Sequence, residues 1–153
     1  MQISSRFTIA VHILTCIDIF GADRKITSDF LADSVNVNPV VIRRLLQQLK
    51  AAGLVTVQRG SGGAAVARPL AEITFLDVYR AVDCVGEEGL FHFHSQPSQN
   101  CPVGRNIHAA LDRRLEQVQQ AMEREMAAIT VADVVQDTRR CIDAEPPAAQ
   151  SAQ

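Results

Sequence analysis

The sequence has no run of eighteen consecutive apolar residues, and polar residues interrupt the apolar face of its opening segment, MQISSRFTIAVHILTCIDIF. A membrane-spanning helix needs about 20 largely apolar residues, and a secretory signal needs a small-residue cleavage pattern that is also missing. We therefore expect no membrane association and a cytoplasmic location. In that compartment the four cysteines are expected to be mostly thiols.

The sequence also lacks the usual motifs of an enzyme. It has no glycine-rich phosphate loop and no paired-acid motif. A cysteine near histidines can act as a nucleophile with its base, but no third orienting group stands at a recognisable spacing. The RGSGG segment is too short for a dinucleotide site and follows the wrong element. We predict that the chain is not an enzyme and binds no cofactor.

Charge is distributed unevenly along the 153 residues, which are about enough for one domain and 47% hydrophobic. The net charge is −2, but residues 1–68 carry 8 Lys and Arg against 4 Asp and Glu, whereas residues 69–153 carry 7 against 13. Phosphate contacts supply much of a protein's affinity for DNA, so the basic half is the candidate nucleic-acid surface. Such an asymmetry also arises by chance, and this alternative stays open.

Two helices are expected before the most basic segment. Ser5 is expected to cap a helix over residues 6–20, in which apolar residues recur at helical spacing. Thr27 or Ser28 is expected to cap a second, shorter helix that runs through Ser34. The pair begins a helix-turn-helix pattern.

The segment NPVVIRRLLQQLKAAG predicts the third helix. Asn38 is its expected cap, and Pro39 occupies the first helical position, where a missing N–H costs nothing. The expected buried stripe is Ile42, Leu45, Leu46 and Leu49. The other faces are expected to hold Val40, Val41, Arg43, Arg44 and Gln47. The first turns of a recognition helix are where side chains meet base edges in duplex DNA.

A β-hairpin is expected directly after this helix. Gly53 lies just past the helix end, residues 54–57 begin a strand, 60–63 form a turn and 64–67 return. Arg59 is the expected cation for a phosphate or a minor groove. The alternative is that RGSGG is only a permissive turn. Together the helices and hairpin predict a mainly α winged helix-turn-helix domain over residues 1–84.

A long C-terminal helix is predicted after a helix at about 74–84 and a loop at 85–102. The residues that step by three or four are Val103, Ile107, Leu111, Leu115, Val118, Met122, Met126 and Ile129. About 26 residues at roughly 1.5 Å each span near 40 Å, longer than the core of a small winged helix needs. We expect this helix to pair with a second copy, although packing within one chain is the alternative. The helical region is placed at 103–140, including a last short helix, and a disordered tail at 141–153.

These segments together resemble the Rrf-type, or BadM-like, family of bacterial winged-helix regulators. The resemblance lies in SSRFTIAVHIL, LADSVNVNPVVIRRLLQQLKAAGLV, RGSGG, EITFLDVYRAV and CPVGRNI. It implies a homodimer, on double-stranded DNA, that represses or activates promoters. Repression of a palindromic operator is the favoured reading. The DNA contacts it implies are Asn38, Val40, Val41, Arg43, Arg59 and Ser61, with Arg44 beside them and Ser4 and Arg6 as weaker backbone contacts.

The chain departs from well-known members of that family in its cysteines. Those members hold an iron-sulfur cluster with three closely spaced cysteines before the long helix, whereas this loop has only Cys101. Cys84 precedes the loop, and Cys16 and Cys141 belong to other elements. Because a cluster needs converging thiolates, we expect none.

Cys101 immediately precedes Pro102 and is therefore an expected helix cap, where the helix dipole stabilises a thiolate. Arg105 and His108, one and two turns further on, are expected to assist. We predict a sensor of oxidants or electrophiles, with Cys84 as the candidate resolving thiol and Cys141 as another candidate partner. The alternative is an inert buried cysteine.

Three further readings stay open. His92, His94 and Cys101 allow a metal site, although their spacing matches no standard zinc motif. Phe91 and Phe93 allow a small-effector pocket, so that residues 91–108 would sense a metal or small ligand. A winged helix also serves in some proteins as a protein-interaction module.

Overall fold

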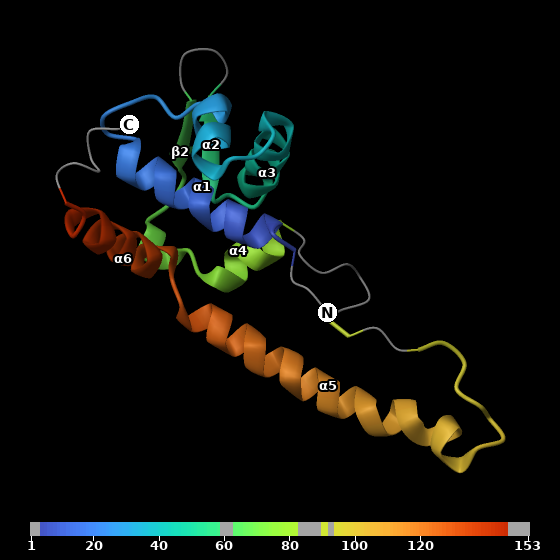
Figure 1. The fold of residues 1–153 in the computed structure, drawn as a ribbon. Helices are drawn as coiled ribbons and strands as arrows, with labels where there is room; N and C mark the ends of the chain where they lie inside the picture. The colour runs from blue at the N-terminus through green and yellow to red at the C-terminus, as the bar shows by residue number, and fades with distance from the viewer. Residues whose placement is uncertain (1–3, 59–62, 83–89, 92–93, 147–153) are drawn as a thin grey trace.

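Helix α1 runs through the middle of the molecule, and the other elements pack around it (Figure 1). The computed structural model describes residues 4–58, 63–82, 90–91 and 94–146. In chain order the elements are α1 (Arg6–Phe20), α2 (Ser28–Val35), α3 (Pro39–Ala51), β1 (Val55–Gln58), β2 (Gly63–Val66), the 3-10 turn η1 (Leu70–Glu72), α4 (Phe75–Ala81), α5 (Pro102–Ala128) and α6 (Val131–Asp143). The predicted class, mainly α with one small hairpin, is confirmed.

The core forms where α1 meets its neighbours. Seven of the eight consecutive positions 10–17 in α1 are buried, because the helix is apolar on nearly every face. Ile13 and Leu14 are completely buried, as are Leu31 of α2 and Ile42 and Leu49 of α3. The stripe predicted for α3 is therefore confirmed. Burial of such side chains, at about 1.5–3 kcal/mol each, fixes how α2 and α3 are held against α1.

The hairpin pairs β1 with β2 in antiparallel register, Val55 opposite Val66 and Gln58 opposite Gly63. Gly63 has a φ of +74°, and a Cβ there would lie 2.8 Å from the carbonyl oxygen of Ile26. The next residue, Ala64, donates its N–H to that same oxygen at 2.9 Å. A glycine is thus required where the wing meets the loop between α1 and α2.

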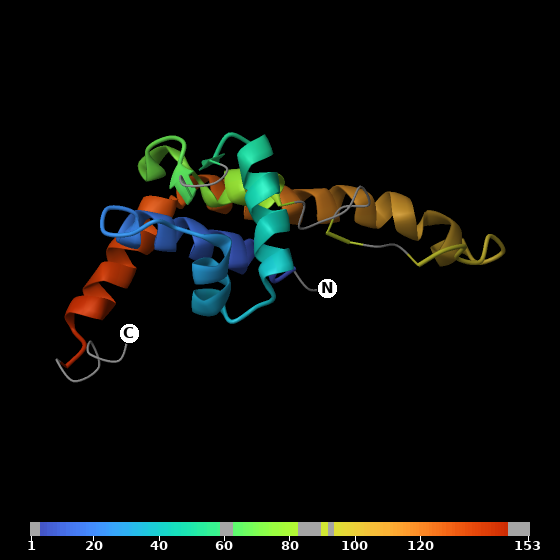
Figure 2. The same cartoon turned by 90° about the horizontal axis from the view of Figure 1, so that it is seen from above.

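Helix α5 projects away from this body, and both ribbon views show it (Figures 1 and 2). Its C-terminal end is anchored because Phe75 donates its N–H to the Ile129 carbonyl at 2.9 Å and Val131 donates to the Ile73 carbonyl at 2.8 Å. Arg80 of α4 also pairs with Glu123 of α5 at 3.2 Å. The N-terminal end of α5 lies far from helices α1 to α3 (Figure 1).

Helix α6 returns to the body and packs against α1 (Figure 1). Val131 and Val135 are its buried residues. A capping box at its start joins Thr130 to Asp133, whose carboxylate accepts from the Thr130 N–H at 2.8 Å and hydroxyl at 2.7 Å. These hydrogen bonds lower the pKa of the Asp133 carboxyl.

Several expected boundaries were wrong. The side chain of Ser5 caps nothing; Ser4 Oγ instead accepts the Arg6 N–H at 3.3 Å, because Ser5 itself has helical backbone angles. Helix α4 ends at Ala81 instead of near residue 84. Helix α6 continues to Asp143, so the boundary expected at 140 falls inside a helix and Cys141 is helical. Helix α5 begins at Pro102, as expected from a cap at Cys101, and only the segment boundary placed at 103 is one residue late.

No helix in the described part of the chain is both long enough and apolar enough to cross a membrane.

Candidate nucleic-acid interface

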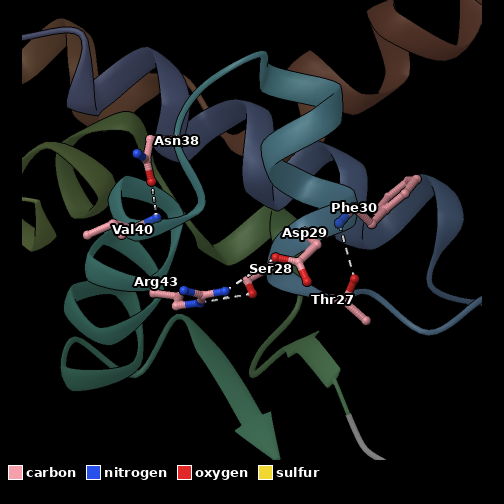
Figure 3. Close-up of polar contacts among 7 residues, drawn as sticks. All are labelled: Thr27, Ser28, Asp29, Phe30, Asn38, Val40 and Arg43. Carbon is pink, nitrogen blue, oxygen red and sulfur yellow. Dashed lines mark hydrogen bonds and ion pairs between the residues drawn. The ribbon is translucent and has the colours of Figure 1, made fainter.

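The first turn of α3 is capped and presents apolar side chains to solvent. Asn38 has an extended backbone, and its Oδ1 accepts the Val40 N–H at 2.9 Å, as the sequence predicted (Figure 3). Val40 is 65% exposed and Val41 38%. Exposed apolar groups at a helix start suit contact with the methyl group of thymine in a major groove.

Arg43 lies one turn further along α3 and reaches across to the start of α2. Its Nε–H donates to Ser28 Oγ at 3.3 Å, and its Nη2 pairs with Asp29 Oδ1 at 3.3 Å (Figure 3). Both partners of the ion pair are largely exposed, so the pair contributes at most about 1 kcal/mol. The guanidinium is held in place at little energetic cost and remains at the surface. Arg44 is also exposed.

A cleft of about 540 Å³ opens beside Arg43, between the start of α2, the outer face of α3 and the hairpin. Three cationic side chains line it: Lys25, Arg43 and Lys50. Thr27 and Ser28, at the N-terminus of α2, line it as well, and a helix N-terminus favours anions through its N–H groups and dipole. The cleft has the charge and polarity of a phosphate-binding site.

Lys25, Thr27 and Ser28 are the residues that sequence reasoning did not place in this interface. Thr27 was read only as a cap, and it is one, since its Oγ1 accepts the Phe30 N–H at 3.1 Å. The available signal was a lysine two residues before that capping pair. Lys25 could be assigned to the interface only from the fold, which places it in the same cleft as Lys50.

The remaining predicted contacts are at the hairpin tip and at the chain start. Arg59 and Ser61 lie outside the described residues, and the strands on either side of them form the predicted hairpin. Ser4 and Arg6 are half-buried at the start of α1, which packs against α3. The described part therefore brings the α3 residues together with the start of α2.

Cys101 is the N-cap residue of α5 and is exposed, which excludes the alternative of a buried cysteine. The backbone N–H groups of Gly104 and Val103 lower the pKa of its thiol. The loop before it is folded tightly against the helix start: Cys101 donates its N–H to the Ser98 carbonyl at 3.2 Å, and a Cβ on Gly104 would collide with that same carbonyl. Arg105 donates its N–H to the Cys101 carbonyl at 3.1 Å.

Only some of the other residues expected in the sensor lie in the described part of the chain. The His108 ring packs edge-on against the His94 ring, with centroids 5.6 Å apart. His92, Phe93 and Cys84 lie outside the described residues, so neither the alternative metal site nor the candidate resolving thiol is defined. Cys16 is buried on α1 and hydrogen-bonds Ser34, and Cys141 is exposed on α6.

The arrangement of α2, α3 and the hairpin defines a winged helix-turn-helix protein. The family model of "Rrf2: Iron-dependent Transcriptional regulator" matches residues 3–137. The chain belongs to the Rrf2 family of transcriptional regulators, which bears out the resemblance and the prediction that it is not an enzyme.

Relatives agree with this assignment. YwnA of Bacillus subtilis, named as a candidate helix-turn-helix transcriptional regulator, is 45% identical over 134 residues, which are 88% of this chain and 97% of YwnA. A crystal structure titled as that of a candidate DNA-binding protein is 41% identical, covers 85% of this chain and 98% of its own, and has a TM-score of 0.66. A candidate transcriptional regulator of Lactobacillus plantarum is 26% identical, covers 88% and 90%, and has a TM-score of 0.73.

The family's description names iron, and an iron centre needs several ligands that converge on one point. Among the described residues, no three His, Cys, Asp or Glu side chains converge as ligands for a metal ion. Cys16 lies in α1, Cys101 caps α5 and Cys141 lies near the C-terminal end of α6, so the three thiols belong to different helices. These residues do not fit an iron centre, and no step below depends on one.

Proposed function

We propose that this chain is a homodimer that binds a palindromic operator in duplex DNA and represses transcription. The observation that carries this proposal is the exposed first turn of α3 beside a cleft lined by three cationic side chains. Side chains at the start of a recognition helix read base edges, and cations beside it neutralise phosphates. Repression follows if the occupied operator overlaps a promoter. Such a regulator acts in the bacterial cytoplasm.

The proposed DNA contacts fall into two groups. Base contacts are assigned to Val40, Val41, Arg43 and Arg44. Backbone contacts are assigned to Ser4, Arg6, Lys25, Asn38, Lys50, Arg59 and Ser61. Groove contacts carry sequence information, whereas phosphate contacts position the protein.

Dimerisation through α5 is supported by its exposed apolar stripe. None of the 27 residues of α5 is buried, and Val103 and Val118 are 67% and 53% exposed. A single chain rarely leaves such a stripe in water, because apolar area removed from water contributes about 25 cal/mol per Å². A second copy of α5 covers it by symmetry and sets two recognition helices about one DNA turn apart.

Replacement of single arginines by alanine tests the assignment of the DNA contacts. Arg43→Ala is expected to relax base preference, since a bidentate base contact discriminates by about 1–3 kcal/mol. Arg59→Ala is expected to weaken binding to all sequences about equally. Arg140→Ala, which removes the same charge from the exposed face of α6, is the control and is expected to change little. Equal losses on specific and scrambled DNA from both test variants would contradict the assignment.

We further propose that Cys101 is the switch. A peroxide takes up the electron pair of the thiolate, the O–O bond breaks, and a sulfenic acid forms with release of hydroxide. With an electrophile such as a quinone, the same sulfur adds to a ring carbon: a C–S bond forms, the C=C π bond breaks, and a proton from water completes the adduct. In a mobility-shift assay, peroxide is expected to release wild-type protein from DNA, added thiol to restore binding, and Cys101→Ser to be unresponsive. Release of the serine variant by peroxide would remove Cys101 from the mechanism.

A second candidate function rests on the same exposed valines. Val40 and Val41 also suit an apolar protein partner, which would make the winged helix an interaction module. Steep salt dependence separates the two readings, because displacement of counterions from phosphates is specific to nucleic acid. A module that binds proteins would show neither the salt slope nor operator preference.

A further inference from the structure

A cavity of about 400 Å³ lies on the opposite side of α1 from the core with α3, between α1, the end of α2 and α6. Its walls are mainly apolar and include Val11 and Ile19 of α1 and Val134 and Ile142 of α6. The cavity is open to solvent on one side, since His12 and Ser34 are exposed, whereas Val11, Thr15 and Cys16 are buried. Small-molecule sites begin at about 300 Å³ and are mostly apolar with a few convergent polar groups.

One edge of the cavity is polar, and its groups come from two helices. His12 Nε2 lies 3.0 Å from Ser34 Oγ, and Cys16 Sγ lies 3.3 Å from the same oxygen. Burial lowers the pKa of His12 and raises the pKa of Cys16, so both groups are neutral near pH 7. A hydroxyl has one donor and two acceptor positions, and Ser34 is therefore able to bond a ligand in addition.

The other hydroxyls at the cavity are turned back to their own helices. Thr15 donates to the Val11 carbonyl at 2.9 Å and Thr138 to the Val134 carbonyl at 2.7 Å, so each presents its methyl group. No Asp, Glu, Lys or Arg is among the described residues that line the cavity. Arg139 and Asp18, which tie α6 to α1 at 3.0 Å, neutralise each other nearby. A charged ligand would be desolvated here without a counter-charge.

We propose that this cavity binds a small, neutral, largely apolar molecule of about the size of two fused aromatic rings, with one polar group bonded at the Ser34 edge. A second copy of the chain is less suited to it, since the extended apolar surface for a copy is on α5. The polar edge and the absence of charged lining residues instead match a neutral ligand with a single hydrogen-bonding group.

The position of Ser34 connects the cavity to the DNA-contacting surface. Ser34 is the penultimate residue of α2, and Asn36, which follows, takes a left-handed backbone in the turn to α3. A ligand at Ser34 therefore bears on how α2 presents α3. This consequence, an effector that changes DNA affinity, rests on the proposed function; the binding site itself does not.

Fluorescence titration of the full chain with N-phenyl-1-naphthylamine tests the site without DNA. We expect one probe per chain, with binding at least about tenfold tighter than that of 8-anilino-1-naphthalenesulfonate, which adds a negative charge to the same rings. Thr138→Phe fills the cavity and is expected to weaken probe binding at least about tenfold. Gln136→Phe, on the exposed face of the same helix, is the matched control. No binding, equal binding of both probes, or equal effects of the two variants would overturn the proposal.

A second comparison remains decisive if Thr138→Phe does not fold. Wild-type protein is expected to bind 1-naphthol more tightly than naphthalene by about threefold or more, and Ser34→Ala is expected to remove that preference. A preference that survives Ser34→Ala would overturn the proposed polar edge. If the protein binds the probe but not DNA, the ligand site stands and the proposed function is wrong. If it binds DNA but not the probe, the proposed function stands and the ligand site is wrong.

Discussion

Asn38 joins the local chemistry of the chain to its proposed role on DNA. Its side chain caps α3 through the Val40 N–H, and its exposed position places it beside the proposed phosphate contacts. Asn38→Ala is expected to lower the free energy of unfolding by about 1 kcal/mol, because an N-cap is lost. The measurement is urea unfolding.

Asn38→Asp separates the two roles of that side chain. Aspartate caps a helix about as well as asparagine, so the unfolding free energy is expected to stay near that of the wild type. DNA affinity is expected to fall, because the new carboxylate faces phosphates. Fluorescence anisotropy measures this affinity, and undiminished binding by the aspartate variant would place Asn38 away from the DNA backbone.

Asp29 pairs with Arg43, one of the side chains proposed to contact DNA. The two side chains pair at 3.3 Å at the edge of the cationic cleft. Asp29→Asn is expected to tighten DNA binding by about threefold or more at low salt, because one phosphate-repelling charge is removed and Arg43 is released. Asp33→Asn makes the same charge change one turn along α2 and serves as the control. Weaker binding by Asp29→Asn alone would show that the carboxylate orients Arg43 for DNA.

Cys101 is expected to react faster than an ordinary thiol. Because its pKa is lowered by the N–H groups of Gly104 and Val103, its thiolate fraction at pH 7 exceeds that of a thiol with the usual pKa of about 8.5. Iodoacetamide labelling, followed by mass spectrometry from pH 6 to 9, is expected to give a midpoint for Cys101 below that value. Exposed Cys141 is the internal reference. A midpoint at or above about 8.5 would contradict the proposed activation.

At the scale of elements, the helix-turn-helix could be predicted because its signals are local. Thr27 and Asn38 cap α2 and α3, and the apolar residues of α3 have helical spacing. The wing could be placed for the same reason. The requirement for glycine at Gly63 could not be predicted, because it comes from a contact with the carbonyl of Ile26, which is distant in the sequence.

Packing between elements could not be predicted in the same way. The sequence predicted the apolar face of α6 but not the helix on which it packs. That helix is α1, and the packing depends on the direction in which the Thr74–Thr130 bridge sends the chain. The assignment of Ser5 as a cap failed for a local reason: its backbone is already helical, and Ser4 Oγ accepts the Arg6 N–H instead.

Helix α5 offers a direct test of the proposed dimer. Val118→Glu puts a charge in the middle of the exposed apolar stripe and is expected to raise the dimer dissociation constant at least about tenfold, because the charge must be desolvated in the interface. Gln117→Glu adds the same charge one residue away, on the polar face, and is expected to have little effect. Sedimentation equilibrium distinguishes the two, and a dimer unaffected by Val118→Glu would place the interface elsewhere.

At the scale of the whole molecule, two different surfaces serve the two proposed tasks. The cationic cleft lies among α2, α3 and the hairpin, and α5 projects from another side of the body (Figure 2). The division agrees with the charge asymmetry in the sequence, in which the excess of basic over acidic residues lies before Pro69. A dimer formed through α5 therefore leaves both recognition helices free to meet DNA.

About half of the candidate site could be anticipated from the sequence. Asn38, Val40, Val41 and Arg43 belong to one helix, whose cap and periodicity fix which residues are exposed. Lys25 and Ser28 belong to the site because α2 folds onto α3, which one-dimensional patterns do not encode. The cavity beside Ser34 has the same origin, since α6, which supplies one wall, is far from α1 and α2 in the chain.

The most direct test of the central claim is an equilibrium titration of the protein against its own promoter DNA and a scrambled duplex, followed by fluorescence anisotropy at several salt concentrations. We predict one dimer per site, a preference for the promoter of at least about a thousandfold, and a logarithm of affinity that falls linearly with the logarithm of salt. Equal affinity for both duplexes, or binding independent of salt, would contradict the assignment of this chain as a sequence-specific DNA-binding regulator.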